Sequence, residues 1–385
     1  MEFGFTEEQR AFRDTAHRFA ADRLKPHYQK READAAFEPG LAEEMAALGL
    51  VGADLPEEFG GSGIDGVTSG MLIEQIGWGD LSVSYIQLLT SLLGDIVVNH
   101  GSEEMKNACV PRLTAGKDII ALGLTEPRGG SDAANLVTKA ERSNSGYVLN
   151  GEKTSISCAS QADWIIAVAR TGKPEDGARG VTAFLVPMDA EGVSTSDFDD
   201  VGSVAVGRGS VFFDNVRVGD EHRLGAEGAG FREVMAGFDY SRALIGLQVI
   251  GCAKASLEET WEWVQQRTAF GNPIAKYQGV TEPLAVAETK LRAAELLCYQ
   301  TLWLRDQGMK HTAEAAMCKW FAPQTAFETV HQCILLHGHM GYAKDMPHQQ
   351  RLRDIMGLQI GDGTAQIQKM IIAREKIGKV AVPYA

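Results

Sequence analysis

The hydrophobic period of this chain changes twice, and these changes limit what it can fold into. As far as about residue 118, apolar residues recur at helical spacing. Thr6 and Gln9 form a capping-box pattern before the first helical segment. The clearest further helical segments cover residues 41–48, 69–77 and 85–100. We therefore expect an all-helical N-terminal domain over residues 1–118.

Short apolar runs rich in β-branched residues replace the helical pattern after residue 118. Turn residues, among them Asn144-Ser145-Gly146 and Asn150-Gly151, separate these runs. The expected strands cover residues 119–124, 147–149, 164–168, 181–186 and 211–213. Because the strands do not alternate with helices, a doubly wound parallel sheet is not expected. The pattern predicts a middle β domain over residues 119–225.

Helical spacing returns after the glycine-rich segment 225–230 and continues to the C-terminus. Long amphipathic runs cover Phe231–Gln266, Gln278–Gln307 and Ala313–Leu336. Pro323 predicts a kink in the last of them. We expect antiparallel helices that form a bundle over residues 226–385. The fold class is thus mixed α and β, with a helical domain, a β domain and a helical bundle in that order.

Charge, apolar stretches and cysteines exclude several classes of protein. The formal net charge is −14 with dispersed Lys and Arg, so no basic stripe is available to bind nucleic acid. No apolar stretch is long enough to cross a bilayer, and the N-terminus lacks a signal pattern, so a cytoplasmic location without a membrane span is expected. The six cysteines are scattered without a Cys-x-x-Cys pair and are expected to be reduced core residues.

The segment 358–368 is the first candidate for chemistry. It combines an apolar run, the turn Gly361-Asp362-Gly363 and a helix that Thr364 can cap. This layout holds one carboxylate, Asp362, at a helix N-terminus with free N–H groups and apolar neighbours, which favours a base. The same residues are also compatible with an ordinary surface turn. Both interpretations stay open on this segment alone.

Two other segments could approach a ligand. Residues Leu122–Asp132 run from a strand into a loop with glycines and hydroxyls, which fits either a ligand-binding loop or a glycine-rich corner. Ser155 and Ser157 alternate along a strand, which alone predicts only a solvated strand face. Residues 61–66 match the pattern GxGxxG, but no buried strand precedes them, so we predict a plain loop.

Three further groups lie in the C-terminal half. Asp239 and Arg242 are three residues apart on a predicted helix and could simply pair with each other. Arg267 ends a long helix and could serve a phosphate or the helix C-terminus. His337-Gly338-His339 suggests a metal clip, but no third ligand lies at a fitting spacing, so no metal is expected.

Taken together and in this order, these segments resemble the acyl-CoA dehydrogenase family over essentially the whole chain. The matching segments are Leu124-Thr125-Glu126-Pro127 with Gly130-Ser131-Asp132, Asn150-Gly151-Glu152-Lys153, Arg267-Thr268-Ala269-Phe270-Gly271, Gly338-His339-Met340-Gly341-Tyr342 and Gly363-Thr364-Ala365-Gln366-Ile367-Gln368. Each is weak alone, but five in the family's order are specific. The resemblance implies a helical domain, a β domain and a four-helix bundle, in agreement with the periodicity.

The resemblance also implies FAD, bound between the β domain and the bundle. The positions that match cofactor contacts of the family are Leu122, Leu124, Thr125, Gly130, Ser131, Ser155, Ile156, Ser157, Arg267, Phe270, Gln278, Leu335, Gly338, His339, Thr364 and Gln366. Of these, Arg267, Phe270 and Gln278 match positions that reach the flavin of a neighbouring subunit, and a homotetramer is implied. Positions near the CoA part of the substrate are matched by Ser131, Asp239, Arg242 and Gly363.

The implied reaction is α,β-dehydrogenation of an acyl-CoA thioester. A carboxylate in a dry pocket takes the α-proton, a hydride leaves the β-carbon for flavin N5, and an electron-transfer flavoprotein is the expected acceptor. Asp362 fits the role of the base. A backbone N–H of the same turn, together with a flavin hydroxyl, would hydrogen-bond the thioester oxygen.

The chain departs from the family at the base itself. The family commonly has Glu where this chain has Asp362, and the missing methylene withdraws the carboxylate by about 1.5 Å. We therefore expect a bulkier acyl group, cyclic or α-branched, such as cyclohexane-1-carboxyl-CoA. The subgroup that carries its base on the long C-terminal helix would place it at Ser241, which cannot act as a base unaided.

Two more departures leave alternatives open. Ser155 replaces a Trp that is common beside the flavin, and Leu335 and His339 replace a Gln and a Gly. His339 could contact the flavin or the substrate, or fill space. Three alternatives remain: different flavin chemistry on the same fold, such as 1,4-dehydrogenation of a cyclic enoyl-CoA; an oxidase or a hydroxylase; and a non-catalytic flavin-binding relative.

Overall fold

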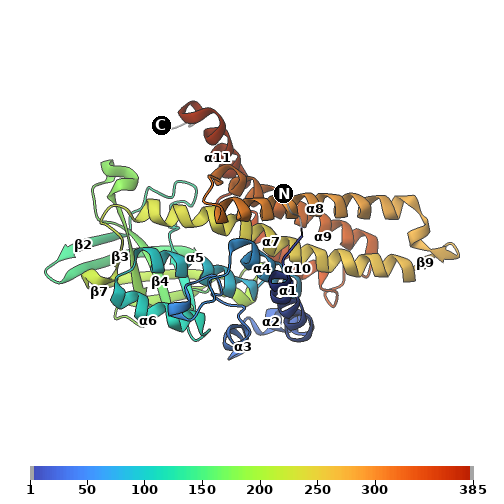
Figure 1. Ribbon diagram of the computed structural model, residues 1–385, viewed down its shortest axis with the longest axis horizontal. Coiled ribbons are helices and arrows are strands. Elements are labelled where there is room, and N and C mark those ends of the chain that lie inside the picture. The colour runs from blue at the N-terminus through green and yellow to red at the C-terminus, as the bar shows by residue number, and fades with distance from the viewer. Residues whose placement is uncertain (1–3, 382–385) are drawn as a thin grey trace.

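A computed structural model describes residues 4–381 as a sheet at one end of an elongated molecule and long helices that extend to the other end (Figure 1). The N-terminal helices cover the junction between these two parts. They are α1 (Glu7–Phe19), α2 (Tyr28–Asp34), α3 (Leu41–Ala47), α4 (Gly66–Gly79), α5 (Ser84–His100) and α6 (Glu103–Thr114). The capping box of Thr6 and Gln9 at the start of α1 is confirmed. Residues 61–65 form the predicted loop, and Gly66 is the first residue of α4.

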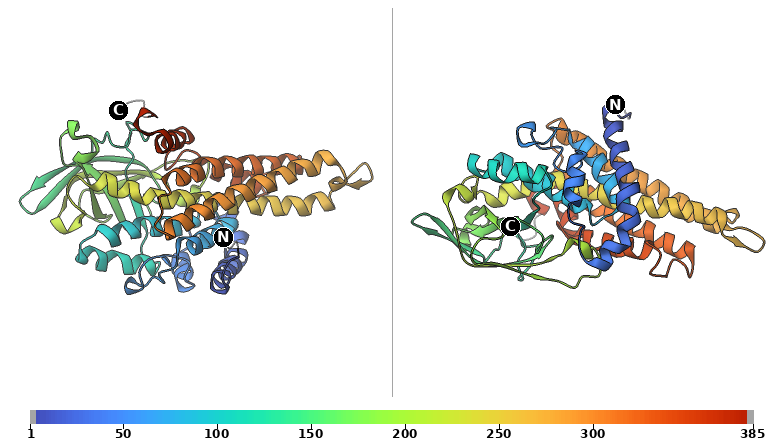
Figure 2. Two further views of the ribbon diagram at one scale, coloured as in Figure 1. Left: turned by 45° about the horizontal axis from the view of Figure 1, so that its top comes forward. Right: turned by 90° about the horizontal axis from the view of Figure 1, so that it is seen from below.

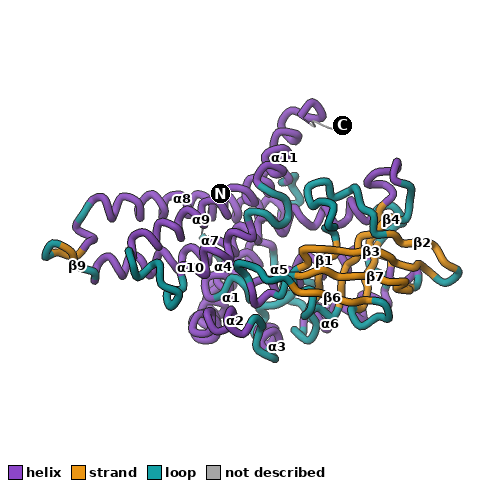
Figure 3. The backbone as a smooth tube through the Cα atoms, turned by 180° about the vertical axis from the view of Figure 1, so that it is seen from behind, coloured by secondary structure: helices purple, strands orange, loops and turns teal. Residues whose placement is uncertain are grey.

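The eight strands of the middle region form one sheet, which is mostly antiparallel. They are β1 (Ile120–Gly123), β2 (Lys139–Ser143), β3 (Gly146–Ile156), β4 (Trp164–Arg170), β5 (Val181–Pro187), β6 (Val193–Asp197), β7 (Gly209–Val218) and β8 (Arg223–Leu224). The path is β6-β7-β3-β2-β4-β5-β8, and β1 pairs with β4 in parallel. Figure 3 shows these strands gathered at one end of the molecule.

One predicted turn is present and another is wrong. Asn144 and Ser145 connect β2 to β3 as predicted. Asn150-Gly151, in contrast, lies inside β3, where the pairing with β7 shifts register between Leu149 and Gly151. The extra residue of such a bulge tolerates the positive φ of +146° at Gly151, so a sequence typical of a turn is accommodated within a strand.

The C-terminal helices are α7 (Gly230–Gln266), α8 (Gln278–Asp306), α9 (Thr312–His337), α10 (His348–Leu358) and α11 (Ala365–Ile377). A small hairpin of β9 (Thr268–Ala269) and β10 (Asn272–Pro273) connects α7 to α8 at the tip of the bundle. Both views of Figure 2 show these long helices projecting beyond the N-terminal helices. α9 is continuous through Pro323, and the kink expected there stays a prediction. The predicted mixed fold is confirmed.

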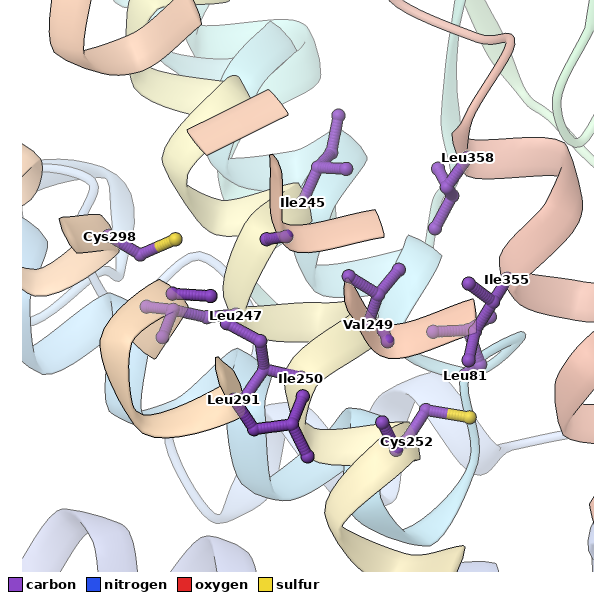
Figure 4. Packing of buried hydrophobic residues seen from close by; sticks show 14 of the residues in the cluster. Leu81, Ile245, Leu247, Val249, Ile250, Cys252, Leu291, Cys298, Ile355 and Leu358 are labelled. Atoms are coloured by element: carbon purple, nitrogen blue, oxygen red, sulfur yellow. The ribbon is translucent and has the colours of Figure 1, made fainter. Parts of the chain in front are cut away.

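The largest hydrophobic core lies where α7 packs on α8, α9 and α10 (Figure 4). Ile245, Val249 and Ile250 of α7 meet Leu291 and Cys298 of α8 and Leu358 of α10 in this core. All six cysteines are buried and free, as expected. Among the described residues, no helix is both long and apolar enough to cross a membrane.

A second core fixes the sheet against the helices. It joins Leu92 and Ile96 of α5 to Ile166 of β4 and Leu185 of β5, and the start of α7 enters it through Phe238. Tyr85 packs against both this core and the core of the bundle. The three regions therefore meet at α5 and α7.

Helices α4 and α7 approach each other unusually closely because glycines face backbone at their contact. A Cβ added to Gly251 would lie 1.9 Å from the carbonyl oxygen of Glu74, and one added to Gly77 would lie 2.4 Å from that of Gln248. Neither oxygen can move without disturbing its own helix. The contact thus requires glycine at both positions.

Gly251→Ala is expected to lower the free energy of unfolding by about 3 kcal/mol or more, because the new methyl group must push the two helices apart. Chemical denaturation of the flavin-loaded protein measures the loss. Gly279→Ala on α8 is the matched control, since no atom lies within 4 Å of its added Cβ. A Gly251→Ala variant as stable as the control would contradict the packing described here.

Candidate active site

The turn between α10 and α11 presents Asp362. Its backbone is left-handed, with φ of +53° at Asp362 and +95° at Gly363. Thr364 caps α11 by accepting a hydrogen bond from the N–H of Ile367. The side-chain amide of buried Gln368 donates to the carbonyls of Asp362 and Gly363, at 3.0 and 3.1 Å. These bonds hold a conformation that non-glycine residues rarely adopt, which is typical of functional sites.

The carboxylate of Asp362 lies in an environment of opposing electrostatic effects. Burial raises its pKa above the ordinary value, while the positive charges of Lys319 and Arg242 act to lower it. Lys319 of α9 is buried, and its Nζ donates to the carbonyl of Leu358 at 2.6 Å. The arrangement suits a group that takes up a proton during a reaction and releases it afterwards.

Arg242 and Asp239 form the ion pair that their spacing suggested, with 2.9 Å between Nη1 and Oδ1. The hydroxyl of Thr312, at the start of α9, donates to the other oxygen of Asp239 at 2.6 Å. The Nε of Arg242 is buried and has no partner within residues 4–381. One donor of a positioned guanidinium is therefore available to a ligand. Ser241 is fully buried, and its hydroxyl faces the carbonyl of Phe238 at 3.4 Å.

A buried ion pair anchors the glycine-rich loop after β1. The Nζ of Lys153 lies 2.7 Å from Oε1 of Glu126, and the same carboxylate accepts the N–H groups of Val137 and Thr138. The N–H of Thr154 donates to the carbonyl of Thr125 at 2.9 Å. The end of β1 and the loop after it are thus fixed to β3, and they carry Leu122, Leu124, Thr125, Gly130 and Ser131.

The end of β3 forms a wall beside this loop. Ser155 is exposed with φ of +60°, Ile156 is buried, and Ser157 is partly covered. Arg208 donates to the hydroxyl of Ser155 at 2.9 Å and is also paired with Asp200.

Tyr85 of α5 links the two halves of the site. The charges of Asp362 and of Arg208 both act on the pKa of Tyr85, which burial raises. The phenol is therefore close enough to both groups to interact with their charges, and it packs where the core of the sheet meets the core of the bundle.

Six of the predicted cofactor residues lie elsewhere, toward the tip of the bundle. The first three are Arg267, Phe270 and Gln278, at or beside the β9–β10 hairpin. The other three, Leu335, Gly338 and His339, lie in the last turn of α9 or directly after it. His337, the last residue of α9, stacks on Trp263 near the end of α7, with 4.9 Å between the ring centroids. Figure 3 places β9 at the opposite end from the sheet. One copy of the chain does not bring these residues to the loop and the wall, whereas Thr364 and Gln366 follow Asp362 directly.

Several of the residues toward the tip of the bundle are exposed. Phe270 is 94% exposed and has φ of +50°, and Leu335 is 57% exposed. His339 is exposed, whereas His337 is buried with its Nδ1 2.9 Å from the carbonyl of Cys333. Among the described residues, no cluster of His, Cys, Asp or Glu could hold a metal ion.

Two residues important for this geometry were not predicted as site residues. Lys319 is the only charged residue in the apolar helical segment 315–323, and a lysine on a buried helix face is a usable signal. Tyr85 gave no such signal, because an aromatic residue in an apolar helix is usually core. Its place at the junction of two cores becomes visible only in the fold.

The loop and the wall fit a flavin on structural grounds. The hydroxyl-bearing residues Thr125, Ser131 and Ser155 are partly or fully exposed, and a Cβ at Gly129 would meet no atom within 4 Å, so a ligand can reach the backbone. The donor groups are hydroxyls and amides, which suit the polar edge of an isoalloxazine ring.

The comparisons with known proteins agree over the whole chain. Three family models match in order: the N-terminal domain of acyl-CoA dehydrogenases over residues 6–117, the middle domain over 121–216 and the C-terminal domain over 228–377. A probable acyl-CoA dehydrogenase of Bacillus subtilis (strain 168) is 34% identical over 378 residues, which cover 97% of this chain and 99% of that protein. A 3-(aryl)acrylate reductase of Clostridium sporogenes is 34% identical over 371 residues, covering 96% and 98%.

A solved structure gives the same result. The butyryl-CoA dehydrogenase of Megasphaera elsdenii superposes with a TM-score of 0.94 at 30% identity, covering 98% of this chain and 100% of that one. The chain therefore belongs to the acyl-CoA dehydrogenase family and is an FAD-dependent oxidoreductase that acts on the CH–CH group of acyl-CoA thioesters.

Proposed function

We propose that Asp362 is the base that removes the α-proton of the acyl-CoA substrate. The observation that carries this proposal is the position of its carboxylate, which is partly buried on a left-handed turn and within range of the charges of Lys319 and Arg242. Burial favours the protonated form and the cations favour the ionised form, so the group can accept a proton without a large change in free energy. Ser241 offers no competing base.

The same turn also offers hydrogen-bond donors. Among residues 4–381, the backbone N–H groups of Asp362 and Gly363 donate to no other group. We infer that one of them binds the thioester oxygen and stabilises the negative charge that develops there when the α-proton leaves. Arg242, with its free Nε, is proposed to bind the CoA part of the substrate together with Ser131, Asp239 and Gly363.

The proposed flavin contacts comprise the loop, the wall and the residues after Asp362. They are Leu122, Leu124, Thr125, Gly130, Ser131, Ser155, Ile156, Ser157, Thr364 and Gln366. When bound, FAD supplies the acceptor for the β-hydride. The chain's own residues would orient the ring through the loop that the Glu126–Lys153 pair anchors.

We propose that the active form is a homo-oligomer, with the tetramer as the expected state. The support is that the β9–β10 hairpin, with Arg267, Phe270 and Gln278 at or beside it, lies at the opposite end of the molecule from the sheet. The end of α9, with Leu335, Gly338 and His339, contacts α7 near that hairpin, and Phe270 is almost fully exposed. In a closed assembly these residues would contact the cofactor of a second copy. The proposed electron acceptor is an electron-transfer flavoprotein.

For the substrate we propose a compact acyl group, cyclic or α-branched. The carboxylate of Asp362 reaches about 1.5 Å less far than a glutamate would, and a branched α-carbon brings the proton closer. Tyr85 supports the same choice, because its ring fills space where the two cores meet, within range of the charge of Asp362, and we propose that it limits the length of the acyl chain.

A second candidate is an oxidase of the same substrates, favoured by one observation. Ser155 is exposed at the position where the family commonly has a Trp, so oxygen would have a shorter path to the ring. Anaerobic turnover with a dye acceptor, compared with peroxide release in air, separates the two candidates.

Asp362→Ala is expected to slow flavin reduction by acyl-CoA on the order of 10³-fold, because it removes the proposed base for the α-proton. The measurement is anaerobic bleaching of the bound flavin after mixing with saturating thioester. Asp345→Ala, in the turn before α10, is the control for loss of a carboxylate elsewhere. Bleaching of the Asp362→Ala variant at the parent rate would show that another group is the base.

Tyr85→Leu is expected to raise kcat/KM for straight-chain acyl-CoA relative to cyclic acyl-CoA by about tenfold, because removal of the ring lengthens the space beside Asp362. A panel of straight, branched and cyclic thioesters measures the ratio. Tyr85→Phe keeps the ring and should keep the parent preference. A parent enzyme that prefers straight chains would refute the substrate proposal.

Lys153→Met is expected to lower the free energy of unfolding by about 3–5 kcal/mol and to weaken FAD binding, since it leaves Glu126 buried without its cation. Denaturation and the release of flavin on dilution measure the two effects. Lys139→Met removes an exposed lysine from the neighbouring strand and should change neither. A variant that is destabilised but binds FAD as tightly as the parent would argue against the loop as a flavin contact.

A further inference from the structure

Lys319 is a buried cation for which the proposed reaction uses only the charge, without a contact of its own to substrate or flavin. Its side chain is about 1% exposed, and its one hydrogen bond within residues 4–381 goes to the carbonyl of Leu358. An ammonium group held away from water is costly unless an opposite charge lies near. A buried Lys319 is therefore expected to have a negative charge nearby.

The hydrogen bond of Lys319 ties it to the segment that carries Asp362. Leu358 is the last residue of α10, and the turn with Asp362 follows at once. A carbonyl at a helix C-terminus carries partial negative charge and favours a cation. α9, which carries Lys319, packs against both α10 and α11, so the ammonium group lies under the turn between these helices.

Charged groups from several helices surround Asp362. α9 contributes Lys319, and α7 contributes Arg242, which also forms an ion pair with Asp239. The phenol of Tyr85 approaches from α5, and Arg374 of α11 acts on Arg242. Among the described residues, Asp362 is the anion whose charge acts on Lys319.

Lys319 is charged over the neutral range. Burial lowers its pKa to about 8, although the carboxylate of Asp362 acts in the opposite direction. Of the two cations that oppose the effect of burial on the pKa of Asp362, Lys319 has the larger influence. Without it, Asp362 would keep its proton to a higher pH, and less of the enzyme would carry a base.

We propose that Lys319 is a positioning residue of the active site, whose ammonium group fixes the turn at Leu358 and keeps the carboxylate of Asp362 ionised before the substrate arrives. This inference rests on the proposed role of Asp362 as the base. It assigns no contact with substrate to Lys319. The residue acts on the reaction only through the turn and the charge of Asp362.

The first test is the pH dependence of flavin reduction, measured anaerobically on the FAD-loaded enzyme with the thioester that the parent reduces fastest. Lys319→Met and Lys319→Gln remove the charge, and the Gln variant keeps a donor for the carbonyl of Leu358. Both should move the acid limb of the profile to higher pH by about one unit or more, because the pKa of Asp362 rises when its cation is lost. At a fixed pH below that limb, the rate then falls about tenfold per unit.

Two controls accompany these variants. Lys319→Arg keeps the charge and should keep the parent midpoint. Lys290→Met removes an exposed lysine that is paired with Glu328 on another face of the bundle, and should change nothing. An acid limb that stays at the parent position in Lys319→Met and Lys319→Gln would overturn the proposal. If only Lys319→Arg folds, a shifted midpoint in that variant would overturn it as well.

The second test needs no change at Lys319 and no catalysis. Asp362→Asn removes the anion whose charge acts on the ammonium group and introduces no new charge. The melting temperature of the variant relative to the parent, both FAD-loaded, should rise as the pH passes about 8, because Lys319 becomes neutral in the folded parent and no longer offsets the cost of burying the ionised carboxylate. A difference in melting temperature that is the same on both sides of this pH would overturn the proposal.

The failure of this proposal and that of the proposed base can be told apart. Rapid flavin reduction by Asp362→Ala would remove Asp362 as the base, whatever Lys319 does. Slow reduction by Asp362→Ala, together with an unmoved acid limb in the uncharged Lys319 variants, would leave the base in place and reject Lys319 alone.

Discussion

The structure depends on α7 being held in two hydrophobic cores at once. Its first turns enter the core between α5 and the sheet through Val234 and Phe238, and the rest of the helix forms the centre of the bundle core. A helix of 37 residues spans about 55 Å. Because one rigid element passes through both cores, the loop after β1 and the turn of Asp362 are placed relative to each other without a hinge between them. Gly77 and Gly251 further fix the position of α7, because they allow the backbones of α4 and α7 to contact each other directly.

The chemistry of the candidate site follows from a balance between two effects of burial. Removing water from around a carboxylate stabilises its neutral form, whereas nearby cations stabilise the anion more strongly when water is absent. At Asp362 the two effects act together, since Lys319 and Arg242 lie in the same dry region. A fully exposed aspartate would be a weak base, and a buried one without cations would stay protonated. As the proposed base, Asp362 therefore needs both the burial and the charges.

Much of the fold could be predicted from the sequence, because the periods of helices and strands are local properties. The bounds of α5, α7 and α9 agree with the apolar spacing to within about two residues. The interior position of Asn150-Gly151 in β3 could not be predicted, since the pairing of β3 with β7 overrides the local preference for a turn. The turn of Asp362 was predicted from its residues, but Lys319 and Tyr85 are remote in sequence. Their roles arise from packing between helices, which no spacing pattern encodes.

The remoteness of the bundle tip from the sheet has a genetic consequence. If each flavin pocket combines the loop and turn of one copy with Arg267 and Phe270 of another, a defect in either set is confined to the pockets that contain it. Two inactive alleles, one damaged at Asp362 and one at Arg267, would then produce mixed assemblies. In these assemblies some pockets would contain an intact Asp362 from one copy and an intact Arg267 from another. Such complementation between alleles would give partial activity in a cell where neither product works alone.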